Sequence, residues 1–143
     1  MQTVVFGGEE RERLAIAVYG YEREPVGDYH DDNWLSVEVA IHAGAFRGKF
    51  QAAFLTGELS AFLDQLKVLL AELRGEARFS TLEEQLTLAL EGNGLGQIDL
   101  RGRAADQSGI GNQLSFQLAL DQTHLQAAVR SLEAAIDAFP VRA

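Results

Sequence analysis

The sequence predicts an α+β fold in which antiparallel β-sheets are covered by two amphipathic helices. Two observations support this class. Residues 50–73 align without a gap on residues 116–139, and each copy is an alternating run, a polar break and a helix-period run. The chain has 143 residues and is 47% hydrophobic, enough for one core of ordinary size. We therefore predict a single domain, 1–143, pseudo-duplicated from a strand-strand-strand-helix unit at about 2–75 and 77–140.

The elements follow from the spacing of the apolar residues. Strands are predicted near residues 2–6, 13–21, 34–42, 45–55, 77–91, 96–104 and 112–120, and helices near 58–73 and 123–138. In the repeat, Leu59 aligns with Leu125, Leu63 with Val129, Leu66 with Leu132 and Leu70 with Ile136. The second helix has Ala128 and Ala135 where the first has Phe62 and Leu69. Because this apolar stripe is smaller, we expect the two helices to pack differently.

Polar residues and prolines predict the ends of the helices. Thr56 is the expected N-cap of the first helix, and Gly75 its expected C-terminal stop. The second helix is expected to begin after Asp121 or Thr123 and to end at Pro140.

The third and fourth predicted strands form a hairpin. Leu35, Val37, Val39 and Ile41 alternate with polar residues, which is typical of a half-buried antiparallel strand. A two-residue turn at Ala43-Gly44 would pair Val37 with Phe50 and Leu35 with Ala52. The same register would place Glu38 opposite Lys49 as a cross-strand charge pair.

The charge distribution indicates the kind of partner. The net charge is -9, and residues 1–38 hold nine acidic against three basic side chains. This charge would repel nucleic acid and anionic membranes and would attract a basic protein partner to the N-terminal third. The alternative is that the charge serves only solubility.

The composition also indicates the compartment. There is no cysteine, as in proteins of reducing compartments. The N-terminal segment lacks the basic and apolar regions of a signal peptide, and no apolar run reaches the ~18 residues of a membrane span. We expect a cytoplasmic protein.

The sequence motifs that resemble catalytic or ligand sites have simpler explanations. Gly92–Gly96 follows a strand and precedes another strand, so a hairpin turn is favoured over a phosphate loop. His30, His42 and His124 are not spaced as metal ligands, and no nucleophile is accompanied by a recognisable base. The prediction is a non-enzymatic protein without cofactor or metal, although folding could still bring a carboxylate pair together.

The loop from Pro25 to Trp34 is where acidic and aromatic residues converge. Trp34 lies opposite the apolar row of its strand, and Tyr19 and Tyr21 are expected to lie opposite Leu14, Ile16 and Val18. Aromatic anchors with a charged rim are typical of protein interfaces. The predicted partner-binding residues are Tyr19, Tyr21, Asp28, Tyr29, Asp31, Asp32 and Trp34. The alternative is a solvated connection in which Asp32 or Asn33 binds its own backbone.

Two other functions remain open at this point. Asp28, Asp31 and Asp32 could be oxygen ligands of a small-molecule or cation site, although the run lacks the glycine and distal glutamate of a calcium loop. The sheet edges could instead serve oligomerisation.

The same loop begins a resemblance to a known family. Asp31-Asp32-Asn33-Trp34-Leu35, the Gly44/Gly48 hairpin, the step Phe54-Leu-Thr56 into a Leu-rich helix and Asn112-Gln-Leu-Ser-Phe116 resemble the small bacterial WapI-type immunity proteins and related domains of unknown function. Those proteins are found beside polymorphic contact-dependent toxins. The resemblance implies a cytoplasmic, non-enzymatic protein that binds and blocks a cognate toxin domain.

Overall fold

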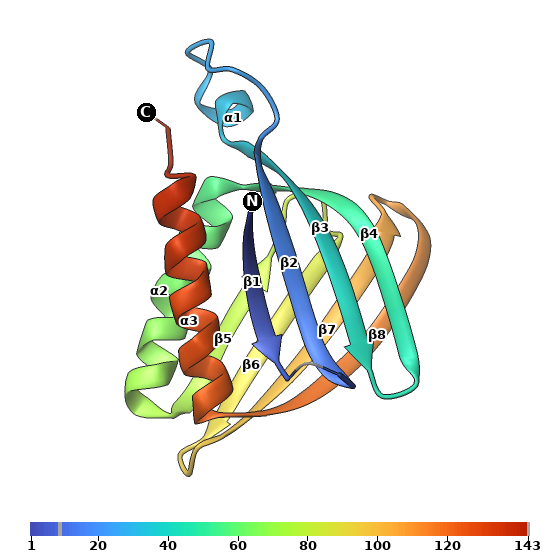
Figure 1. Ribbon diagram of the computed structural model, residues 1–143, viewed down its shortest axis with the longest axis vertical. Helices are drawn as coiled ribbons and strands as arrows, with labels where there is room; N and C mark the ends of the chain where they lie inside the picture. Colours follow the sequence, from blue (N-terminus) through green and yellow to red (C-terminus); the bar gives the residue numbers. More distant parts are fainter. Residues whose placement is uncertain (9, 143) are drawn as a thin grey trace.

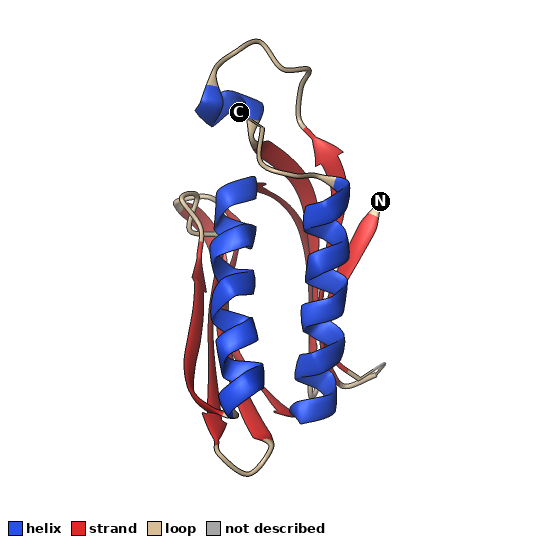
Figure 2. Ribbon diagram, turned by 90° about the vertical axis from the view of Figure 1, so that its left-hand side faces the viewer, coloured by secondary structure: helices blue, strands red, loops and turns tan. Residues whose placement is uncertain are grey.

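Two antiparallel sheets face one another, and two long helices lie side by side along one flank (Figures 1 and 2). The computed structural model describes residues 1–8 and 10–142. The first sheet has the strand order β1-β2-β3-β4 and the second β5-β6-β7-β8. The elements are β1 Gln2–Gly7, β2 Glu12–Tyr21, α1 Tyr29–Asp32, β3 Trp34–Ala43, β4 Phe46–Leu55, α2 Thr56–Glu72, β5 Arg74–Ser80, β6 Leu86–Asn93, β7 Gln97–Gln107, β8 Ile110–Asp121 and α3 Gln122–Ala138.

This architecture confirms the predicted α+β class but corrects the repeat unit. Each unit contains four strands followed by a helix, not three strands. The range 77–91, predicted as one strand, is parts of β5 and β6 separated by a turn in which the Glu84 N–H donates to the Thr81 carbonyl at 3.0 Å. Glu84 adopts a positive φ of 57°. Because this turn contains neither glycine nor proline, the sequence carries no turn signal there.

The core lies between the two sheets and under the two long helices. Alternate residues of every strand point into it, which is why the period-two pattern predicted the buried rows correctly. One cluster of buried side chains draws on both units, and its largest fully buried members include Phe6, Phe54, Phe62, Phe79 and Leu66. Phe62 of α2 contacts Phe79 of β5, with ring centroids 4.9 Å apart.

Each long helix covers the edge strand that begins the other unit. Helix α2 packs on β5, and α3 packs on β1. The Gln65 side-chain oxygen accepts from the Arg78 N–H at 2.8 Å, and the Ser131 hydroxyl accepts from the Val5 N–H at 3.2 Å. Gln65 and Ser131 are equivalent positions of the repeat. The two helices therefore block two sheet edges that would otherwise present free amides.

The β3–β4 hairpin has the predicted faces but a different register. The turn is Gly44-Ala45, because Ala43 pairs with Phe46, and Gly44 supplies a φ of +62°. Val37 therefore pairs with Ala52 and Leu35 with Phe54, a shift of two residues from the prediction. A shift of two keeps every side chain on its face.

The predicted charge pair between Glu38 and Lys49 is present, but the two residues are not directly opposite one another. Glu38 lies opposite Gln51 and accepts from its amide at 3.0 Å. Lys49 lies diagonally across, with its ammonium 3.9 Å from the Glu38 carboxylate.

The N-terminal ends of α2 and α3 use equivalent capping residues. The N-cap of α2 is Leu55 rather than the predicted Thr56, and the Glu58 carboxylate accepts from the Leu55 N–H at 2.7 Å. In α3 the N-cap is Asp121, one of the two predicted residues, and its N–H donates to the His124 ring. Glu58 and His124 align in the repeat, so both helices close their first turn from the N3 position.

The predicted end of α2 at residue 73 differs by one residue from the observed end, but the predicted stop, Gly75, lies two residues after the residue that caps the helix. Leu73, not Gly75, caps the helix, with a left-handed φ of 58°. A Cβ atom at Gly92 would lie 2.5 Å from the Leu73 carbonyl oxygen, so the strand beside the cap needs a glycine. Helix α3 ends at Ala138, just before Pro140 as predicted.

None of the helices within the described ranges combines the length and the apolar character that crossing a membrane requires.

Candidate functional site

The connection between β2 and β3 projects from one end of the first sheet and carries the short helix α1 (Figure 1). Asp28 is the N-cap of α1 and accepts from the Asp31 N–H at 3.2 Å. The Asp32 carboxylate accepts from the N–H groups of Val26 at 2.9 Å and Gly27 at 2.8 Å. Asp32 is only 3% exposed. It therefore holds the loop in shape from the inside, which corrects its predicted place on an exposed rim.

Hydrogen bonds also set the ionisation of Asp32. The Val26 N–H, then the Gly27 N–H and the Arg23 guanidinium, lower the pKa of this carboxyl below its ordinary value, against the opposing effect of burial. The carboxylate is therefore charged at neutral pH and ties the loop backbone together.

Asn33 connects the loop to the C-terminal segment. Its amide nitrogen donates to the carbonyls of Tyr29 and Arg142, and its oxygen accepts from the Arg142 N–H at 2.8 Å and the Thr56 hydroxyl at 2.7 Å. Asn33 is 2% exposed, so a buried amide satisfies both ends of its side chain. The loop, the start of α2 and the segment after α3 therefore meet at one residue.

Tyr21 does not lie on the outer face, as the alternation had predicted. A β-bulge at Tyr19 shifts the register, so that Tyr21 pairs with Leu35 and turns toward the core side. Its ring packs edge-on against Phe139, its hydroxyl bonds to the Pro140 carbonyl, and the Arg142 guanidinium lies 3.4 Å above the ring centre. Tyr21 is therefore part of the attachment of the C-terminal segment.

Five predicted residues remain at least partly accessible at this end of the molecule. Tyr29 is 57% and Tyr19 46% exposed, and Trp34 is half-buried on the outer face of the first sheet. Asp28 and Asp31 are exposed on α1, where Asp31 lies 3.5 Å from Arg23. The structure thus separates the predicted set into a structural pair, Tyr21 and Asp32, and an accessible group, Tyr19, Asp28, Tyr29, Asp31 and Trp34.

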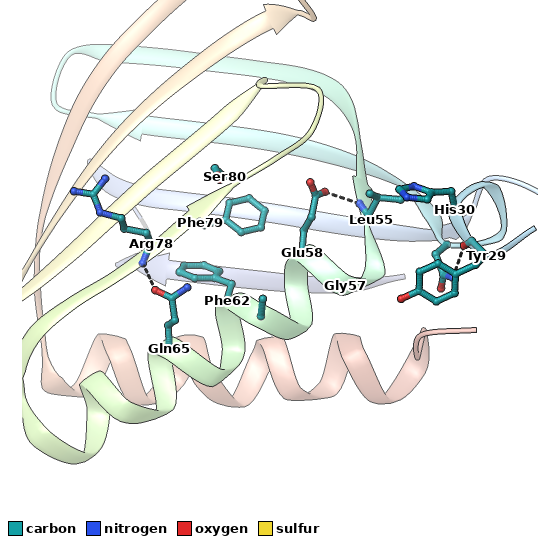
Figure 3. Close-up of a pocket in the computed structure, with 12 residues that line it drawn as sticks. Tyr29, His30, Leu55, Gly57, Glu58, Phe62, Gln65, Arg78, Phe79 and Ser80 are labelled. Carbon is teal, nitrogen blue, oxygen red and sulfur yellow. Dashed lines mark hydrogen bonds between the residues drawn. The ribbon is translucent and has the colours of Figure 1, made fainter. Parts of the chain in front are cut away.

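A cleft of about 350 Å³ adjoins this group, between α1, the first turns of α2 and β5 (Figure 3). Tyr29 and His30 lie at one end of it, and Gln65 and Arg78 at the other. Phe62 and Phe79 lie between the two ends, where their buried rings close the cleft toward the core. We call this hollow the α2–β5 cleft.

Glu58 is the acidic group of the α2–β5 cleft. Its two carboxylate oxygens accept from the N–H of Leu55 at 2.7 Å and of Leu82 at 2.6 Å. Burial raises the pKa of Glu58 above its ordinary value, and the nearby negative charge of Glu83 adds to this, while the two N–H groups act in the opposite direction. The cleft therefore holds a partly desolvated carboxylate.

The three aspartates of the loop do not form a cation site. Asp32 points to backbone N–H groups, while Asp28 caps α1 and Asp31 faces Arg23. Over residues 1–8 and 10–142, no group of three or more histidine, cysteine, aspartate or glutamate side chains is placed to hold a metal ion.

The sequence interpretation missed the α2–β5 cleft. Phe62 was identified only as a core residue of the helix stripe, and Phe79 lay within a predicted strand. Glu58 had one usable signal, its place three residues after the residue that caps the helix. Nothing in the local pattern shows that β5 lies beside α2, because that contact depends on how the two units pack.

Comparison with known proteins identifies a family. The model of the immunity protein WapI-like family matches residues 5–140, nearly the whole chain, and confirms the resemblance noted from the sequence. No curated protein matches the chain in sequence.

Proposed function

Because the chain belongs to the immunity protein WapI-like family, we propose that it binds a cognate toxin domain in the cytoplasm and blocks it without catalysis. The observation that carries the proposal is the accessible group at the loop end of the first sheet. There, exposed Tyr29, Asp28 and Asp31 lie on a loop that the rest of the molecule holds in place, and exposed Tyr19 lies near the end of β2.

The rigid attachment of this loop favours a binding role. Asn33 and Asp32 fix the loop from within, so its exposed residues lose little conformational freedom when a partner binds. Tyr29 and Tyr19 offer large side chains with a polar tip, which are enriched at protein interfaces. These two tyrosines, with the half-buried Trp34, would supply the desolvated contact.

Charge supports a basic partner. The protein carries a net charge of -9, and Asp28 and Asp31 add negative charge next to the exposed aromatic residues. Complementary charge mainly accelerates the encounter of two proteins. The proposed target surface is the positively charged substrate groove of a toxin, which the acidic loop would cover.

A kinetic experiment tests the proposal. The partner is a basic protein domain encoded beside this gene, and its association is measured at several salt concentrations. Changing Asp28→Asn and Asp31→Asn together should slow association and flatten its salt dependence, while Asn keeps the N-cap of α1. Glu91→Gln with Asp99→Asn is the matched control, because it removes the same charge from the outer face of the second sheet. Equal rates for the two double variants would contradict the proposal.

A further inference from the structure

The α2–β5 cleft contains a gap in the cover of the β5 edge. The Arg78 N–H is occupied by Gln65, and the Leu82 N–H by Glu58. Alternate residues of an antiparallel edge strand direct their amide and carbonyl groups to the same side. Ser80 lies midway between Arg78 and Leu82, so its backbone groups face α2 as well. Ala61, which lines the cleft on the helix side, has no side-chain group that could reach them.

Hydrogen-bond acceptors therefore converge in the cleft. The outward carbonyls of Arg78 and Ser80 lie on the strand side, and the Glu58 carboxylate lies on the helix side. Each oxygen of Glu58 accepts one backbone N–H, which leaves further acceptor capacity on both. Among Arg78, Ser80 and Leu82, only the Ser80 N–H remains as a backbone donor. Acceptors therefore outnumber donors along this stretch, and a ligand with several donors matches it better than an anion does.

The charge of the cleft is also uncompensated. Among the described residues, no lysine or arginine forms an ion pair with Glu58, and the Arg78 guanidinium pairs with Glu76 and points away from the carboxylate (Figure 3). The N-terminus of α2 contributes only about half a positive charge. The full charge of Glu58 exceeds it, so the cleft remains negative.

The walls of the cleft suit a long side chain. Gly57 and Ala61 leave room on the helix, and Phe62 and Phe79, each 2% exposed, close the cleft toward the apolar core. Methylene groups pack on such surface while a charged head reaches polar groups at the end. A volume of about 350 Å³ is at the small end of the ~300–1,000 Å³ found for ligand pockets.

We propose that the α2–β5 cleft binds the guanidinium of an arginine side chain, held by the Glu58 carboxylate and the free edge carbonyls of β5. Guanidinium has five donors in a fixed plane and can reach several acceptors at once, whereas ammonium is a strongly hydrated point charge. That the arginine belongs to a toxin and enters beside Tyr29 rests on the proposed function. That the cleft binds an arginine side chain does not depend on it.

The test uses the whole chain and N-acetyl-arginine amide as the probe, followed by NMR. The ring signals of Phe62 and Phe79 should shift with saturation, and the titration midpoint of the Glu58 carboxyl should move to lower pH. N-acetyl-citrulline amide, of the same shape without charge, should produce neither change. N-acetyl-lysine amide should bind more weakly. Equal binding of citrulline, equal binding of lysine or no shift with arginine would each overturn the assignment.

Two variants distinguish binding in the cleft from a general effect of negative charge on the probe. Glu58→Gln should weaken binding of the arginine probe about tenfold or more, the cost of one charge-assisted hydrogen bond. Glu72→Gln, which removes a carboxylate at the opposite end of α2, should leave it unchanged; equal weakening by both would count against the cleft. Because wild-type protein gives the primary readout, the test does not depend on the variant folding. Probe binding without any toxin complex would refute the proposed function and leave this assignment standing.

Discussion

The two units of the repeat build the same junction between a helix and an edge strand, but with side chains of different size. In the α3–β1 junction the short Ser131 side chain reaches the Val5 N–H, and Ala128 lies where α2 has Phe62. In the α2–β5 junction the longer Gln65 side chain makes the equivalent bond. The first junction thus combines a small core residue with a short side chain on the edge amide, and the second a large core residue with a long one.

The units differ in a second place, the connection between their second and third strands. In the first unit it spans residues 22–33 and contains α1, while in the second it is a turn of residues 94–96. Both differences lie at the same end of α2, where Tyr29 lines the α2–β5 cleft. The candidate binding surface therefore lies on the loop of the first unit and on the contact of α2 with β5 of the second unit.

The largest expected effect on stability comes from position 62, where the two junctions differ in the size of the core residue. Phe62→Ala removes a fully buried ring and should cost about 3–5 kcal/mol of the free energy of unfolding. Ala128→Phe, the reverse change in the other unit, should cost about 1–3 kcal/mol by overpacking. Urea unfolding monitored by circular dichroism measures both. A smaller loss for Phe62→Ala than for Ala128→Phe would show that Phe62 contributes less to the core than its burial indicates.

The next largest effect concerns an asparagine in each of the two connections between the second and third strands of a unit. Asn33→Ala should cost about 2–3 kcal/mol, because it leaves the Arg142 N–H and the Thr56 hydroxyl without their buried acceptor. Asn93→Ala is the counterpart in the second unit, where the side chain bonds to the Leu95 N–H in an exposed turn. It should cost less than about 1 kcal/mol. Thermal unfolding of both variants checks this order, and similar losses would show that Asn33 does not anchor the loop.

A smaller effect concerns the two edge contacts. Gln65→Ala and Ser131→Ala each remove one hydrogen bond to an edge amide and should each cost about 1 kcal/mol. Hydrogen exchange distinguishes them. Gln65→Ala should speed exchange at the Arg78 amide, and Ser131→Ala at the Val5 amide. Faster exchange at both amides in either variant would mean that the edges are not protected separately.

The smallest effect is a pH dependence. Because the pKa of Glu58 is raised in the folded protein, the folded state binds this proton more tightly than the unfolded chain does. The contribution of Glu58 to stability therefore falls as pH rises from its unfolded to its folded pKa. Glu58→Gln should remove this fall, and chemical unfolding on both sides of that window measures it. An unchanged pH profile in the variant would show that Glu58 is not desolvated.

The sequence predicted those features that depend on local periodicity. The buried rows of β3 and the apolar stripe of α2 followed from spacings of two and of three to four residues. The hairpin register was wrong by two, since a pattern of period two cannot distinguish registers that differ by two. Tyr21 was placed on the wrong face because the bulge at Tyr19 leaves no mark in the alternation.

The candidate site was less predictable than the fold. Asp32 looked like its neighbour Asp31, and only the folded loop shows that one carboxylate is buried among N–H groups. The α2–β5 cleft joins residues from α1, α2 and β5, and their proximity depends on how the two units pack. Such a site needs the tertiary structure.

Amide hydrogen exchange of the protein, free and bound to its cognate toxin domain, tests most directly whether the binding surface consists of α1 and the α2–β5 cleft. We predict slower exchange on binding in α1, the first turns of α2 and the β5 edge at Ser80, with α3 and the outer face of the second sheet unchanged. Protection confined to α3 or to the outer face of the second sheet, with α1 unaffected, would contradict the account.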